Sequence, residues 1–296
     1  MKKIITLAML CSIAAGANAA TTGSAFLKII PGAREQGVAG AATALGGTLT
    51  SAWANPASAA KLEKRQAALS HVELIENAKL EFAAFSHEGF GGRLFYGFTY
   101  LHYAELEGRD INGSLTGNFS AYDMALQAGY ARQMGALSVG FAVKGVRNKI
   151  ENESGNGFGL DAGAVYDFEK FRLGLAAVNV GRSGKVGSIN ESLPATVALG
   201  AAVPVYFITL TADAKRNIAE NRTTLAGGGE ITLLKLLGLR AGYSRDITNK
   251  DKENADAIKG FNAGFGLDLS ICIIDYAYTH QGELGQNHRF TLSAKF

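Results

Sequence analysis

Apolar and polar residues alternate along most of the chain from about residue 66 onward. In the stretch LSVGFAVKGV, residues 137–146, Leu137 and Phe141 fall on one side of an extended chain and Lys144 falls on the other. The same period of two recurs in the segments 158–168, 208–215, 237–246 and 289–296. Because the side chains of a β-strand point alternately to its two faces, this pattern predicts strands with one apolar and one polar face.

Turn-forming residues divide this region into about 14 strands. Short connections are expected near 89–92, 134–135, 169–170, 203–205, 234–235 and 269–270, and longer polar ones near 105–117, 148–156, 181–193, 216–221, 246–257 and 281–288. Tight turns alternating with longer loops, together with an even number of strands, are typical of outer-membrane barrels. We therefore predict an all-β fold in which residues 66–296 form a transmembrane antiparallel β-barrel. The alternative is an exported, soluble β-sandwich or solenoid.

The first 19 residues have the layout of a secretory signal peptide. Lys2 and Lys3 precede an apolar run over residues 4–15, and Ala17-Asn18-Ala19 fits a cleavage site with small residues. Residues 1–19 are therefore left out of the fold prediction, and the rest of the chain is expected to be exported to the outer membrane.

Composition fits a membrane barrel better than a helical membrane protein. The chain has 37 glycines and only 4 prolines, and its mean hydropathy is +0.07. After residue 19, however, it contains no run of about 18 apolar residues, which a membrane-spanning helix needs.

Cys272 is the one cysteine outside residues 1–19, so no internal disulfide is expected. The formal net charge of +3 gives no reason to expect a nucleic-acid partner. Lipid is the expected surrounding.

Residues 20–65 lack sustained alternation and are rich in small residues. Asn55-Pro56, after Trp53, is a helix-start signal, because a capping side chain is followed by proline at the first helical position. A short helix is expected within residues 51–64. We predict that residues 20–65 form a small plug in the barrel, with Trp53, Asn55 and Pro56 as its motif. A disordered periplasmic tail is the alternative.

Charged residues on the polar face of the strands should point into the lumen. The predicted lumen charges are Lys144, Asp161, Asp213, Glu230, Arg240, Asp275 and Arg289, together with Lys215 and Lys295. A short turn near 234–235 would place Glu230 opposite Arg240, and opposite charges facing across strands attract. Both signs are present, so the pattern favours either a filled, rigid lumen or ordinary solvation in a water-filled channel.

The chain ends on an alternating segment, HRFTLSAKF. Phe290, Leu292 and Phe296 share its apolar face. We expect this last strand to close the barrel against the first. Its terminal aromatic residue also fits a recognition signal for the outer-membrane assembly machinery. A domain that happens to end on a strand is the alternative.

Motifs for catalysis or cofactor binding are weak. The five histidines lie on different segments without metal-ligand spacing. The glycines of GNGFG, residues 155–159, lack the strand–helix context of a dinucleotide-binding loop. No nucleophile–base pair stands out, and we expect neither an enzyme nor a bound cofactor.

Three stretches, taken in order, resemble a known family. FLKIIPGAREQGVAGAATAL, AWANPASAAKLEKRQAALSH and GFGLDLSICIIDYAYTHQGELGQNHRFTLSAKF are similar to the beginning and end of PorV/PorQ-type outer-membrane proteins, part of the wider FadL-like superfamily. The chain departs from the family pattern where Ala54 separates Trp53 from Asn55 and where GVAGAA replaces a run richer in glycine. These departures, and external loops that are short for docking large partners, bear on the plug geometry and the secretion role.

The resemblance implies two functions. PorV-like members imply binding or assisting exported cargo proteins in type IX secretion. FadL-like members imply transport of hydrophobic small molecules across the outer membrane. A purely structural membrane protein is a third reading, since fold alone does not select among them.

Overall fold

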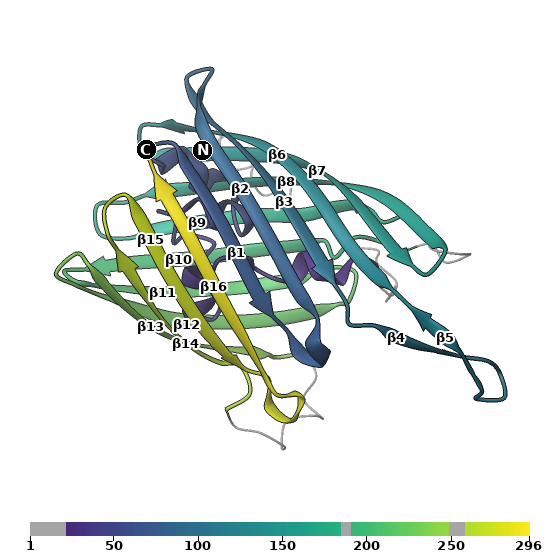
Figure 1. Ribbon diagram of the computed structural model, residues 1–296. Helices are drawn as coiled ribbons and strands as arrows, with labels where there is room; N and C mark the ends of the chain where they lie inside the picture. The colour runs from purple at the N-terminus through teal and green to yellow at the C-terminus, as the bar shows by residue number, and fades with distance from the viewer. Residues whose placement is uncertain (1–21, 185–190, 249–257) are drawn as a thin grey trace.

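The protein is a closed antiparallel β-barrel whose lumen holds the N-terminal segment (Figure 1). The computed structural model describes residues 22–184, 191–248 and 258–296. The signal peptide expected at 1–19 lies outside these residues, as do parts of the loops expected at 181–193 and 246–257. Among the described residues, no helix has the length and apolar character needed to cross a membrane.

Fourteen strands form the barrel, which confirms the predicted fold class and strand number. They are β1 (Gln66–Glu73), β2 (Lys79–Gly89), β3 (Gly92–His102), β6 (Ala121–Met134), β7 (Leu137–Ile150), β8 (Glu153–Asp167), β9 (Arg172–Arg182), β10 (Thr196–Val205), β11 (Ile208–Asn217), β12 (Arg222–Leu233), β13 (Leu237–Asp246), β14 (Phe261–Asp268), β15 (Cys272–His280) and β16 (Gln286–Lys295). Each strand pairs with the next, and β1 pairs with β16 to close the wall.

The two faces of the strands separate as the alternation predicts. In β7, Phe141 is 57% exposed on the outside, whereas Lys144 is 6% exposed on the inside. In β16, Phe290 and Leu292 are exposed outward and Ser293 is buried inward. Strands with an apolar outer row and a polar inner row are those of a barrel that faces lipid.

Three connections differ from the prediction. The loop expected at 148–156 is a two-residue turn at 151–152, because β7 and β8 stay paired to Ile150 and Glu153. The polar stretch 105–117 is not an irregular loop but most of a hairpin, β4 (Leu106–Arg109) and β5 (Leu115–Phe119), that projects beyond the wall. The turn expected at 203–205 lies at 206–207, because β10 continues to Val205.

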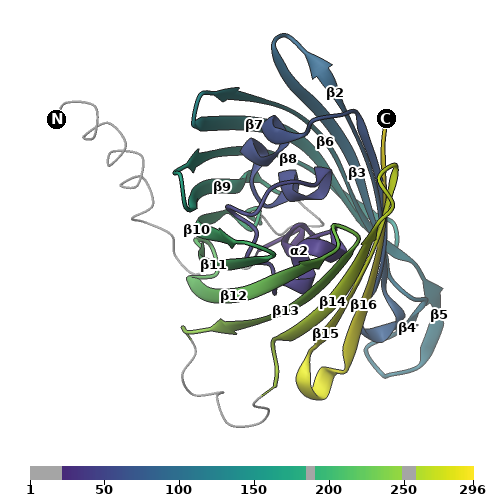
Figure 2. The same ribbon diagram turned by 90° about the vertical axis from the view of Figure 1, so that its left-hand side faces the viewer.

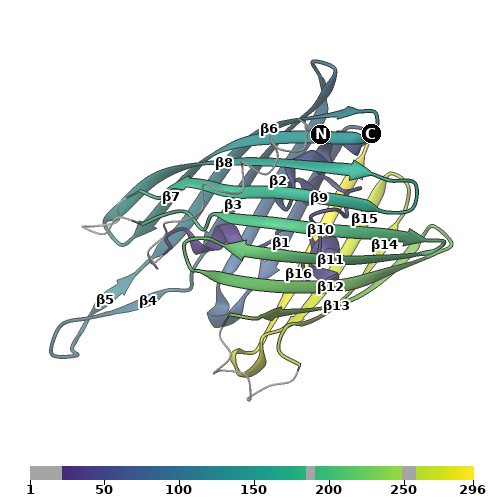
Figure 3. The same ribbon diagram turned by 180° about the vertical axis from the view of Figure 1, so that it is seen from behind.

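The two ends of the barrel differ in their connections (Figure 3). One end, at the right in Figure 3, carries the C terminus and turns of two to four residues; it is called the short-turn end here. The opposite end carries the β4–β5 hairpin and the longer connections, and is called the long-loop end.

The N-terminal segment runs through the lumen from the long-loop end to the short-turn end (Figure 2). At its start, Gly23 donates its backbone N–H to the carbonyl of Ser192, in the connection between β9 and β10. At its end, Lys61 contacts Asp167, just before the turn between β8 and β9. Its helical elements are η2 (Ala25–Lys28), α2 (Ala33–Gly37), η3 (Leu49–Trp53) and η4 (Pro56–Lys61). The single helix expected within 51–64 is thus two short 3₁₀ helices.

Candidate functional site

The predicted plug motif fixes the N-terminal segment to the wall. Asn55 caps η4 by accepting the backbone N–H of Ala57 at 3.1 Å, and it donates to the carbonyls of Thr43 at 2.8 Å and Ala164 at 3.2 Å. A Cβ on Gly163 would lie 1.9 Å from the Asn55 side chain. The absence of a side chain at Gly163 therefore lets the cap reach β8.

Trp53 packs against strands β2 and β3 of the wall. Its ring centroid lies 4.6 Å from that of Phe82 and 6.0 Å from that of Phe95, both in edge-on arrangements. A Cβ on Gly97 would lie 2.1 Å from the indole. The indole of Trp53 therefore occupies the space that the missing side chain of Gly97 leaves on β3. Both Trp53 and Asn55 contact the wall, even though Ala54 separates them in the sequence.

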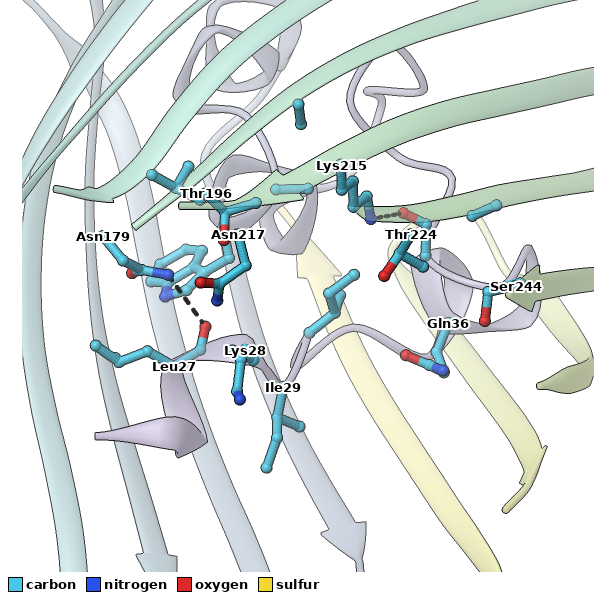
Figure 4. Close-up of a pocket in the computed structure, with 18 of the residues that line it drawn as sticks. Leu27, Lys28, Ile29, Gln36, Asn179, Thr196, Lys215, Asn217, Thr224 and Ser244 are labelled. Carbon is cyan, nitrogen blue, oxygen red and sulfur yellow. Dashed lines mark hydrogen bonds between the residues drawn. The ribbon is translucent and has the colours of Figure 1, made fainter. Parts of the chain in front are cut away.

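Seven of the nine predicted lumen charges are buried, and Lys215 and Lys295 are partly exposed. They form separate groups rather than one network. In the first group, Lys144 lies 2.8 Å from Asp161 and donates to Asn179 at 2.6 Å. The backbone N–H of Asn179 donates to Asp161 at 2.7 Å, beside a bulge in the pairing of β8 with β9. This group links strands β7, β8 and β9 of the wall, and the Nδ2 of Asn179 also donates to the plug at the carbonyl of Leu27, 3.5 Å away (Figure 4).

The second group joins the plug to the wall through Glu230. The register places Glu230 opposite Arg240, as predicted, and the Arg240 Nε donates to it at 2.5 Å. Arg240 also donates to Asp275 at 2.6 Å. From the plug, Arg34 donates twice to Glu230, at 2.8 Å from Nε and from Nη2. The bidentate pair is the geometry in which arginine binds a carboxylate most strongly.

Two opposing effects act on the pKa of Arg34, whose side chain is partly buried. Burial by itself lowers the pKa of Arg34, but the attraction of Glu230 and the hydrogen bonds to it outweigh burial and raise that pKa. Sequence reasoning missed Arg34 and Glu35. Their charges in a segment of small residues were the available signal, but nothing in the sequence names their partners.

Two buried carboxylates hold the plug backbone and its hydroxyls. Asp213 accepts the backbone N–H groups of Ala42 and Thr43, both at 3.0 Å. Glu35 accepts hydroxyl hydrogen bonds, with donor–acceptor distances between 2.5 and 2.9 Å, from Thr48, Thr50 and Ser51. The predicted charge Lys215 also reaches the plug, at the carbonyl of Gly40, whereas Lys295 pairs with Asp268 at 3.0 Å. The lumen polarity is therefore largely used to hold the plug.

A cavity of about 440 Å³ lies between the plug and the wall, towards the long-loop end (Figure 4). Leu27, Ile29 and Ile30 supply an apolar floor from the plug. The strands and loops supply a polar wall that includes Asn179, Thr196, Lys215, Asn217, Thr224, Ser244 and Arg289. We call this cavity the vestibule. Its lining suits a molecule with both an apolar part and a polar group.

Arg289 stands apart from the other predicted lumen charges. Its side chain lines the vestibule, and the residue is only 4% exposed. Within the described part of the chain, Arg289 has no salt bridge within 4.0 Å, and its Nε has no hydrogen-bond partner. The Nδ2 of Asn217, also in the lining, is likewise buried without a partner. Buried donors without acceptors are rare and mark a place for a ligand, a water or an ion.

Glu220 binds the start of the N-terminal segment, residues 22–28, which is called the strap here. Thr22 and Lys28 donate to its carboxylate at 2.5 and 2.6 Å. Burial by itself raises the pKa of Glu220, but those hydrogen bonds and the charges of Lys28 and Arg222 outweigh burial, so its pKa lies below the ordinary 4.5. The strap is therefore held by an ionised carboxylate.

The last strand closes the barrel as predicted. All of β1 pairs with β16, from Gln66↔Lys295 to Glu73↔His288. Phe296 donates its backbone N–H to the Arg65 carbonyl at 3.1 Å, and its ring stacks at 6.3 Å from Phe85. Recognition of Phe290, Leu292 and Phe296 during assembly remains a prediction.

No group of three or more histidine, cysteine, aspartate or glutamate side chains suited to a metal ion occurs within residues 22–184, 191–248 and 258–296.

The fold and the vestibule define a closed barrel with an internal plug, and solved structures described as transporters and channels have a similar fold. The chain is similar to a Pseudomonas aeruginosa FadL homologue, with 14% identity, a TM-score of 0.59, and coverage of 90% of this chain and 98% of that one. It is similar to the Pseudomonas putida toluene transporter TodX, with 15% identity, a TM-score of 0.63, and coverage of 88% and 95%. It is also similar to the monoaromatic hydrocarbon channel CymD, with 13% identity, a TM-score of 0.59, and coverage of 90% of this chain and 97% of that one.

These similarities place the fold with FadL-like barrels. No family model matches the sequence, and no curated protein matches it. The PorV/PorQ resemblance thus remains a prediction.

Proposed function

We propose that this protein admits small molecules through the outer membrane, and that its preferred solutes carry an apolar part and an acidic group. The observation that carries the proposal is Arg289, a buried cation without a salt bridge among the described residues, beside an apolar floor. A buried charge is stable only when it is paired. A carboxylate held by Arg289, with the solute's apolar part on Leu27 and Ile29, would satisfy both surfaces.

The outer row of the strands supports the membrane location. Large apolar side chains such as Leu126, Phe141 and Leu199 are more than half exposed on that face. Contact of these side chains with lipid chains has no free-energy cost, whereas their contact with water is unfavourable. Export by a signal peptide and insertion by the assembly machinery belong to the same proposal.

The comparisons favour small-molecule passage over a role in protein secretion. The similar structures are described as a FadL homologue, a toluene transporter and a hydrocarbon channel. They are transporters and channels, in keeping with the prediction of a non-enzyme. Binding of exported cargo stays the second reading, and capture of proteins that share a C-terminal signal domain would favour it.

Uptake into liposomes tests the proposal. Octanoate and octanol have the same chain length, but only octanoate carries an acid, so their entry can be compared in vesicles that contain the refolded protein. Arg289→Gln should lower octanoate entry and leave octanol entry unchanged. Arg109→Gln is the control, because Arg109 lies exposed in the β4–β5 hairpin, away from the vestibule. Equal entry of octanoate through the protein and its Arg289→Gln variant would contradict the assignment.

A further inference from the structure

The vestibule contains two buried hydrogen-bond donors that have no acceptor among the described residues. One is the Nε of Arg289, and the other is the Nδ2 of Asn217, a residue that is 8% exposed. The Oδ1 of Asn217 already accepts the backbone N–H of Glu220 at 2.9 Å. Because a turned amide would bring N–H against N–H there, the amide orientation is fixed, and its nitrogen points into the vestibule (Figure 4). Both donors are therefore available to a solute.

These two donors lie on distant parts of the barrel wall. Asn217 ends β11 and Arg289 lies in β16, five places away in the closed order of the fourteen strands. Neighbouring strands are about 4.8 Å apart, so roughly 24 Å of wall separates the two positions. A single carboxylate is too small to bridge them. A solute that pairs with both donors must carry polar groups at two separate ends.

The plug crosses the lumen between the two sides of the wall. The Leu27 carbonyl accepts from Asn179 of β9, and the Ala33 N–H donates to Thr291 of β16. Strands β9 and β16 are seven places apart among fourteen, so they lie on opposite sides of the barrel. Between these anchors, Ile29 lines the vestibule. Six residue steps cover up to about 20 Å, which leaves room for an alkyl chain of medium length along the apolar floor.

The charges beside Asn217 decide the kind of polar group that fits the far end. Lys28 and Arg222 line the vestibule, but both pair with Glu220, at 2.6 and 3.9 Å. Lys215 lies 3.6 Å from a carboxylate of the wall. The cations near Asn217 are thus already paired. A second carboxylate there would meet the negative charge of Glu220, whereas an uncharged oxygen would not.

We propose that the preferred solute is a medium-chain carboxylic acid with an uncharged oxygen, a hydroxyl or a carbonyl, at its far end. Its carboxylate binds Arg289, its chain lies on Leu27 and Ile29, and its terminal oxygen accepts a hydrogen bond from the Nδ2 of Asn217. This inference rests on the proposed function and adds the far-end group to it. A vestibule that was only apolar at that end would disfavour the added oxygen, because burial of a polar group without a partner is unfavourable.

Displacement of radiolabelled octanoate tests the far-end group. The protein is refolded into phosphatidylcholine vesicles, and vesicles without protein give the background. Three unlabelled acids of the same chain length are compared: octanoate, 7-oxooctanoate and octanedioate. 7-Oxooctanoate should displace the label at a concentration roughly two- to tenfold lower than octanoate does, which is the usual contribution of one hydrogen bond. Octanedioate should need a higher concentration than 7-oxooctanoate, since its second carboxylate meets Glu220.

A single substitution assigns the preference to Asn217. Asn217→Asp keeps an acceptor for the Glu220 N–H but removes the donor, so 7-oxooctanoate should lose its advantage over octanoate. The ratio of the two acids is the readout, because both carry the carboxylate that an added negative charge would repel. Asn118→Asp is the matched control, since Asn118 lies exposed in the β4–β5 hairpin, and it should keep the preference. Folding of each variant is checked by heat-modifiable migration.

The outcomes separate this inference from the proposed function. If 7-oxooctanoate displaces the label no better than octanoate from the unaltered protein, the far-end group is refuted and the proposed function stands. A preference that Asn217→Asp retains would also overturn the inference, and stronger displacement by octanedioate would overturn the choice of an uncharged group. If the protein has no octanoate binding that Arg289→Gln removes, the proposed function itself is wrong. The comparison of acids on the unaltered protein decides the matter even if Asn217→Asp does not fold.

Discussion

Removing the Glu230 carboxylate should release the plug. In Glu230→Gln, Arg34 and Arg240 lose the negative charge that they share, one of the two acceptor oxygens becomes an amide donor, and Asp275 remains as the one carboxylate of the group. All the groups involved lie inside the lumen, where the side chains of Glu230 and Arg240 are 7% and 6% exposed. Removing one partner of a buried ion pair costs roughly 3–5 kcal/mol, because it leaves an uncompensated buried charge.

That cost weakens the folded position of the plug relative to a displaced one. At about 1.4 kcal/mol for each factor of ten, the displaced population should rise roughly a hundredfold to a few thousandfold. Planar-bilayer recording is the assay, because a displaced plug leaves an open lumen and a conductance step. Arg34→Met removes the plug side of the same pair and should raise the frequency of openings too.

A surface pair provides the matched control. Glu107 and Arg109 lie 2.9 Å apart in the β4–β5 hairpin, with side chains that are more than half exposed. Such pairs contribute about 0–1 kcal/mol, so Glu107→Gln should leave the openings unchanged. If Glu230→Gln shows no more openings than Glu107→Gln, the ionic group does not hold the plug.

Three further outcomes are expected. Leu292→Arg should lower the folded fraction, measured by heat-modifiable migration, by an amount that reflects about 2–4 kcal/mol for a cation facing lipid, while Leu292→Met should not. The ion pair of Glu220 with Lys28 should be fully formed above pH 4.5, the ordinary pKa of a glutamate, and should be lost as the pH falls through the lower pKa of the folded state. The frequency of channel openings should therefore increase in acid, and Glu220→Gln should abolish that pH dependence. Deleting Phe296 should slow assembly without changing the denaturation midpoint of barrel that has already folded, and an altered midpoint would contradict its role as a signal.

The sequence predicted the wall of this protein better than its contents. Strand number and face follow from the alternation of neighbouring residues, so Phe141 and Lys144 could be placed from local pattern alone. The pairing of Glu230 with Arg240 needed only one short turn. The path of residues 22–65 could not be predicted, because no periodicity marks it and its partners are distant. Arg34 lies 196 positions from Glu230.

The residues of the vestibule show the same limit. Arg289 could be placed inside the barrel from its parity in β16. That no described carboxylate pairs with it depends on where Glu35 of the plug and the carboxylates of the wall lie in the folded chain, which is a three-dimensional property. The β4–β5 hairpin escaped prediction because, standing away from the wall, it has no buried face to impose an apolar row.

The plug's contact with the last strand has a consequence for biogenesis. Ala33 donates its backbone N–H to the Thr291 hydroxyl at 2.9 Å, and Ser70 of the first strand lies 2.8 Å from the same oxygen. One hydroxyl thus touches the plug and both edges of the seam. Contacts across such long stretches of chain form late and slowly. We therefore expect the N-terminal segment to support the barrel while β1 and β16 pair. Its deletion should delay closure even in a chain whose strands are intact.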